Sequence, residues 1–62
     1  MNRIQKKFIC DALNQEHKLS EWESQFVNDL AAKDGEYEKR GVELTLSQKQ
    51  NEILNRISQK LD

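Results

Sequence analysis

Apolar residues recur at helical spacing in three stretches of the chain, and each stretch predicts one amphipathic helix. The predicted helices cover residues 2–16, 21–33 and 48–61. Each has one apolar stripe with polar side chains opposite, which predicts an all-α fold: a compact three-helix bundle forming a single domain, 1–62. The stripes are Ile4, Phe8, Ile9, Ala12 and Leu13; Trp22, Phe26, Val27, Leu30 and Ala31; and Ile53, Leu54, Ile57 and Leu61.

Two of these helices have a clear start signal. Ser20 with Glu23, and Ser47 with Gln50, have the spacing of a capping box. In that motif the serine side chain accepts from the backbone three residues on, and the acidic or amide side chain reaches back to the serine N–H. His17 falls near the end of the first helix, where positive charge suits the exposed carbonyl groups.

Residues 34–46 are the least regular part of the sequence and predict an irregular connector. The Asp34-Gly35 dipeptide predicts that the second helix ends there. Apolar and polar residues alternate over 42–46, as in a short strand. A lone strand has no partner in this chain, so we favour a connector whose apolar residues pack on the helices. The alternative is an edge strand that pairs with another chain.

The second and third helices also resemble each other. An offset of 27 residues places Leu19-Ser20 over Leu46-Ser47 and aligns both caps and both apolar stripes. Two capped helices of matched shape are natural antiparallel neighbours, with the first helix covering their open side. The match indicates either duplication or the general similarity of capped amphipathic helices.

Trp22 interrupts this match, because it aligns with Lys49. It shares one side of its helix with Phe26 and Leu30, which predicts a core anchor. In so thin a core, however, the indole can stay partly exposed. An exposed tryptophan is a common anchor of protein interfaces, and this is the alternative interpretation.

The short chain limits the chemistry that it can support. A domain of 62 residues buries only about 60% of its unfolded surface, so a deep catalytic cleft is not expected. The single cysteine and single histidine cannot supply a structural zinc site, and the sequence has no phosphate-binding loop. We therefore predict no enzymatic activity, no cofactor and no metal. Cys10, beside Phe8 and Ile9, is expected to be a small buried or half-buried hydrophobic residue.

The compartment follows from similar arguments. No apolar run approaches the roughly 18 residues of a membrane span, and the first residues lack the apolar segment of a secretory signal. Small secreted domains usually need several cysteines, so a single cysteine favours the reducing cytoplasm. We expect no association with membranes.

The charge pattern leaves three kinds of partner open. The net charge is −1, which argues against strong nonspecific DNA binding. Protein binding is therefore the first hypothesis, nucleic acid the second and a self-assembled helical dimer the third. The candidate residues for a protein interface are Trp22, Tyr37, Arg3, Lys6 and Lys7. The candidate nucleic-acid face, which would act together with the basic N-terminal residues, consists of Gln48, Asn51, Asn55, Arg56 and Gln59.

Two segments, 19–33 and 44–61, resemble a small helical module of accessory proteins from phages and plasmids. The shared pattern is L-S-x-W-E-x-x-F, a spacer, then L-[ST]-x-[KR]-Q-x-x-x-L-x-x-I. The matching residues here are Leu19, Ser20, Trp22, Glu23, Phe26, Leu46, Ser47, Lys49, Gln50, Leu54 and Ile57. The resemblance implies a helical accessory module that is sometimes attached to DNA-handling proteins. It carries no catalytic or binding residues over to this chain.

The leading hypothesis is therefore a small interaction protein of phage or mobile-element type. It would bind a host enzyme or complex in the bacterial cytoplasm, such as a nucleic-acid enzyme or a defence complex, and modulate or inhibit it.

Overall fold

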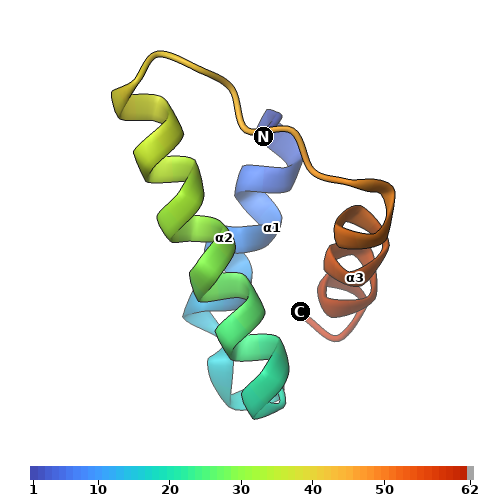
Figure 1. The fold of residues 1–62 in the computed structure, drawn as a ribbon. Helices are drawn as coiled ribbons and strands as arrows, with labels where there is room; N and C mark the ends of the chain where they lie inside the picture. Colours follow the sequence, from blue (N-terminus) through green and yellow to red (C-terminus); the bar gives the residue numbers. More distant parts are fainter. Residues whose placement is uncertain (62) are drawn as a thin grey trace.

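The computed structural model describes residues 1–61, and it confirms an all-α bundle of three helices. The helices are α1 (Arg3–Asn14), α2 (Glu21–Lys39) and α3 (Gln48–Gln59), with one turn of 3-10 helix at Glu16–Lys18 after α1. Figure 1 shows α1 behind the other two helices, and α2 and α3 running in opposite directions. No strand forms in the described residues, so residues 42–46 have no strand partner within residues 1–61.

All three helices begin at a capping box. At Ser20 and Ser47 the geometry is the same in both: the serine Oγ accepts at 3.2 Å, and the serine N–H donates to the Glu23 or Gln50 side chain at 2.9 Å. The two predicted caps are thus confirmed. The third cap, at Asn2 of α1, was not predicted from the sequence.

The second helix is longer than predicted, and the predicted break at Asp34-Gly35 is wrong. Glycine inside a helix costs only about 1 kcal/mol, and contacts with the rest of the molecule offset that cost. The Asp34 carboxylate lies 3.6 Å from the Met1 ammonium group, Glu38 pairs with Lys6, and residue 37 packs against the core.

The helix ends instead just before a second glycine, Gly41, which was also present in the sequence as a possible stop signal. Gly41 has φ +72°, Gly41 N–H donates to the Glu38 carbonyl at 3.0 Å, and Val42 N–H donates to the Tyr37 carbonyl at 2.9 Å. This is the Schellman arrangement, in which glycine adopts the left-handed conformation just after the helix. The connector is therefore residues 40–47, shorter than the predicted 34–46, and its Leu44 is buried in the core as expected.

The core lies where α1 meets both other helices. Its buried residues are Met1, Ile9, Ala12, Val27, Leu30, Leu44, Leu54 and Ile57. Two members of the predicted first stripe are outside it, since Ile4 is 64% exposed and Leu13 is 37% exposed. They lie at the two edges of the stripe, and a bundle this small covers only its centre.

The packing of the helices differs from the prediction in one respect. We expected α2 and α3 to be close neighbours covered by α1, but α1 is the helix that packs closely against both of the others. The contact between α2 and α3 is sparser, and Lys60 and Glu23 form an ion pair across it. A groove is left between these two helices.

Candidate functional site

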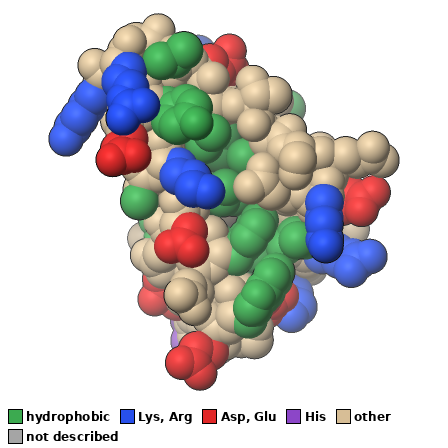
Figure 2. Space-filling model, viewed as in Figure 1, with side chains coloured by type: hydrophobic (Ala, Val, Ile, Leu, Met, Phe, Trp, Pro, Cys, Tyr) green, Lys and Arg blue, Asp and Glu red, His purple; other side chains and the backbone are tan. Residues whose placement is uncertain are grey.

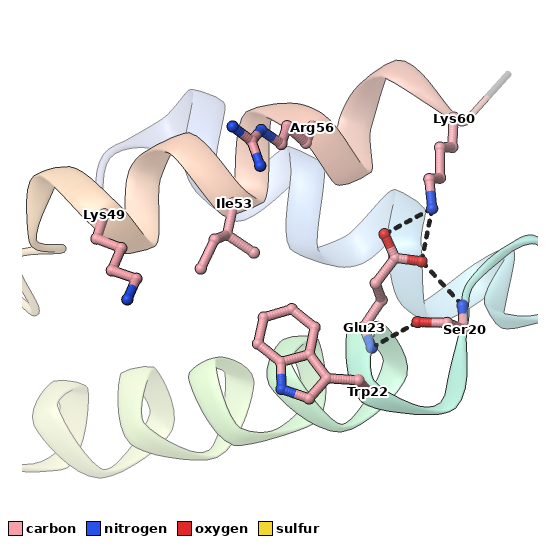
Figure 3. A pocket seen from close by; sticks show the side chains of 7 residues that line it. All are labelled: Ser20, Trp22, Glu23, Lys49, Ile53, Arg56 and Lys60. Carbon is pink, nitrogen blue, oxygen red and sulfur yellow. Dashed lines mark hydrogen bonds and ion pairs between the residues drawn. The ribbon is translucent and has the colours of Figure 1, made fainter.

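The groove between the start of α2 and the length of α3 is the candidate site. It has a volume of about 510 Å³ and is open to solvent. Figure 3 shows Ile53 projecting from α3 toward the indole of Trp22 on α2. The lining residues are Ser20, Trp22, Glu23, Lys49, Ile53, Arg56 and Lys60.

Trp22 is the largest side chain in this groove and it is 59% exposed. The interpretation of this residue as a core anchor is therefore wrong, and the alternative of a partly exposed indole is correct. Its ring stacks on Phe26 with centroids 5.6 Å apart and planes 14° apart, while Phe26 packs against the core. A second, smaller hollow of about 290 Å³ borders the same ring pair, beside Gln25 and Asp29. The indole is thus held in place while much of its surface stays in water.

The acidic residue in the groove, Glu23, forms an ion pair with Lys60. Lys60 Nζ donates to both carboxylate oxygens of Glu23, at 2.8 and 2.7 Å. This hydrogen bond, followed by the one from the Ser20 backbone, lowers the pKa of Glu23 below its ordinary value. Lys49 and Arg56 are exposed, and within residues 1–61 neither has an acidic partner. Among the α3 residues that line the groove, Lys49 and Arg56 therefore carry positive charge that no ion pair within residues 1–61 compensates.

The chemical character of the groove follows from the residues that line it. Its side chains are an indole, a branched alkyl group, two cations without an ion-pair partner among the described residues, a carboxylate paired with a lysine, and a capping serine. These groups offer apolar contact, aromatic stacking and charge complementarity.

Trp22 and the basic N-terminal residues lie at opposite ends of the bundle. Lys6 pairs with Glu38 near the end of α2, whereas Trp22 lies in the first turn of that helix. Sixteen residues of helix separate positions 22 and 38, which is roughly 24 Å along the axis. Arg3 and Lys7 are exposed on α1, and Tyr37 is half-buried against the core rather than in a loop. The structure thus does not join these candidate interface residues into one surface.

The candidate nucleic-acid face is only partly free. Gln48, Asn55, Arg56 and Gln59 are exposed on α3. Asn51 instead accepts a hydrogen bond from Gln5 of α1 at 3.1 Å, which joins the two helices. The connector of residues 40–47 is still longer than the three to four residues that join the helices of a helix-turn-helix motif.

Of the seven residues that line the groove, only Trp22 and Arg56 were candidate site residues, and Lys49 and Ile53 are among the five that were not predicted. The available signal was their spacing with Arg56, because positions i, i+4 and i+7 share one side of a helix. The repeat alignment also set Lys49 against Trp22, and both residues line the groove.

The prediction for Cys10 is wrong, since this residue is exposed. It directly follows the buried Ile9, but the next position of a helix is turned by about 100° and so faces solvent. Its sulfur accepts a weak hydrogen bond from Asn14 at 3.9 Å.

Two further features are absent from the described part of the chain. Among residues 1–61, no cluster of three or more His, Cys, Asp or Glu side chains is placed to hold a metal ion. None of the helices there has the length and apolar character that crossing a membrane requires.

Comparison with known proteins gives no relative for this chain, since no family model, no curated protein and no solved structure matches it.

Proposed function

We propose that this chain is a non-enzymatic interaction module that binds another protein through the groove between α2 and α3. In line with the resemblance described above, it belongs to the phage or mobile-element type. Its partner is a bacterial host enzyme or complex in the cytoplasm, whose activity it modulates or inhibits. The observation that carries the proposal is the 59% exposure of Trp22 beside an open groove.

A tryptophan in this position suits protein binding for two reasons. Tryptophan is among the residues that contribute most to interfaces, because its large apolar surface is buried on association. Stacking on Phe26 already fixes the indole, so a partner loses little affinity in ordering it. Figure 2 shows hydrophobic surface exposed along the front of the molecule between charged side chains. A partner that covers this surface would also stabilise a thin core by mass action.

The test is capture of partners by the immobilised chain, compared with two variants. Trp22→Ala removes the proposed anchor, whereas Ile4→Ala removes an equally exposed apolar side chain that does not line the groove. We expect the Trp22→Ala variant to capture at least about tenfold less of the partner protein than the wild type does. The Ile4→Ala variant should capture as much as the wild type. Far-UV circular dichroism checks that both variants fold. Equal capture by the wild type and a folded Trp22→Ala variant would falsify the proposal.

A second candidate function is nucleic-acid binding by the outer face of α3. The supporting observation is that Gln48, Asn55, Arg56 and Gln59 are all exposed there, and these side-chain types read base edges. Its test is a mobility-shift assay at physiological salt with the wild type and an Asn55→Ala/Arg56→Ala variant. Binding that the variant loses supports this function, and binding that stays unchanged removes α3 from it.

A further inference from the structure

We infer that the groove accepts an acidic amphipathic helix of the partner protein, with two acidic side chains seven residues apart and a bulky apolar side chain between them. This inference rests on the proposed function and adds the chemistry of the partner. It follows from the charge, the spacing and the shape of the groove.

The charge on the α3 wall selects an acidic partner. Lys49 and Arg56 are exposed cations without partners among residues 1–61, and the Glu23 carboxylate is occupied by Lys60. An acidic side chain that enters the groove therefore meets two cations without an ion-pair partner in that part of the chain, while the α3 carboxylate between them in sequence, Glu52, does not line the groove. Apolar surface beside these cations excludes water and strengthens the attraction.

The spacing on α3 sets the spacing on the partner. Lys49 and Arg56 are seven residues apart, which is two helical turns or roughly 10.5 Å along the axis. Ile53 lies between them and points toward Trp22 (Figure 3). A helix lying along this wall matches it with acidic residues at i and i+7 and a bulky apolar residue at i+3 or i+4, which enters between Ile53 and Trp22.

The α2 side of the groove favours such a helix over a nucleic-acid strand. Glu21 and Asp29 are exposed on α2 near Trp22. A nucleic acid carries negative charge all along its backbone and would be repelled by these two residues. An amphipathic helix instead turns its acidic side chains toward α3 and presents neutral or basic ones to α2. Two helical walls also form a surface on which a third helix can pack.

The experiment uses three designed peptides of equal length, each held helical by the same hydrocarbon staple. The first carries the acidic–apolar–acidic spacing, the second has lysine in place of both acidic residues, and the third has alanine in place of the apolar residue. Trp22 is the single tryptophan of the chain, so its fluorescence reports binding directly. We expect the first peptide to bind at least about tenfold more tightly than either of the others, with its preference over the lysine peptide weakened by salt.

A Lys49→Glu/Arg56→Glu variant provides the charge-swap control. Both residues are exposed, so the fold should tolerate the change, and circular dichroism verifies it. We expect this variant to prefer the lysine peptide over the acidic one. Equal affinities for the acidic and lysine peptides, or an unchanged preference in the folded variant, would overturn the inference.

Two further outcomes would also overturn it. The first is tighter binding of a single-stranded oligonucleotide than of the acidic peptide. The second is sedimentation that shows the chain alone to be a dimer dissociated by Trp22→Ala, because a second copy would then fill the groove. If cellular capture requires Trp22 but the peptides show no charge preference, the acidic partner is excluded while the proposed function stands.

Discussion

The apolar stripe of α3 is covered along one edge and open along the other. Leu54 and Ile57 are 0% and 1% exposed in the core. Ile53, one residue before Leu54, is only half-buried and borders the groove opposite Trp22. The same helix therefore contributes to stability with one edge and presents apolar surface with the other. The comparison teaches that an amphipathic stripe can be wider than the core of the fold requires. The apolar side chains at its uncovered edge are then free to contact another molecule.

The sharpest test of this difference compares the stability of two variants, each with alanine at one of these neighbouring positions. Leu54→Ala should destabilise the fold by about 2–5 kcal/mol, because it leaves a cavity in a closed core. Ile53→Ala should cost less than about 1.5 kcal/mol, since part of the side chain already contacts water. Urea unfolding followed by circular dichroism measures both. Similar losses for the two variants would mean that the groove edge is part of the core.

The glycine inside α2 and the glycine just after it extend the comparison to the backbone. Gly41 has φ +72° and fixes the turn that directs Leu44 into the core, so Gly41→Ala should cost about 1–2 kcal/mol. Gly35 lies inside the helix on its exposed side, and an added Cβ would meet nothing within 4 Å. Gly35→Ala should therefore stabilise the fold by up to about 1 kcal/mol. Thermal unfolding of the two variants should shift in opposite directions, and a shift of the same sign would contradict this account of α2.

The smallest effect concerns the ion pair that closes one end of the groove. The pKa of Glu23 is lowered in the fold, so its contribution to stability is present above the ordinary pKa near 4.5 and is lost as the pH falls through the lower value. Glu23→Gln gives the first capping box the composition of the second and removes only the charge. The variant should be less stable than the wild type by under about 1 kcal/mol at pH 7, because Lys60 is half exposed.

Thermal unfolding at pH 7 and pH 3 measures this difference in stability between the Glu23→Gln variant and the wild type. The difference should shrink at the lower pH. Glu38 and Lys6 form an exposed pair that also titrates, but it is present in both proteins and drops out of the comparison. A difference that stays constant with pH would show that the Lys60 pair contributes nothing.

The sequence predicts much of this fold because its signals are local. Apolar periodicity located the three helices, and Ser20 and Ser47 located two of their starts. The end of α2 was misplaced because two glycines compete as stop signals. Only contacts distant in sequence, such as those of Met1 with Asp34, decide that the helix continues through Gly35.

The candidate site was predictable only in part, because it depends on how the helices pack. Trp22 was found as an exposed aromatic candidate, and Arg56 as a cation on α3. Their juxtaposition depends on the antiparallel course of α2 and α3 and on the central place of α1. A periodic pattern marks a stripe but not which of its edges a neighbour covers, so Ile4 was placed in the apolar stripe and a core position was favoured for Trp22 over the exposed alternative.

The exposed thiol on α1 has a practical consequence. Cys10 is the single cysteine of the chain, and α1 contributes no residue to the groove lining. Maleimide coupling at this sulfur would attach every molecule to a sensor surface in one orientation, without a fusion tag. Each immobilised copy would then keep the groove between α2 and α3 accessible to the surrounding solution.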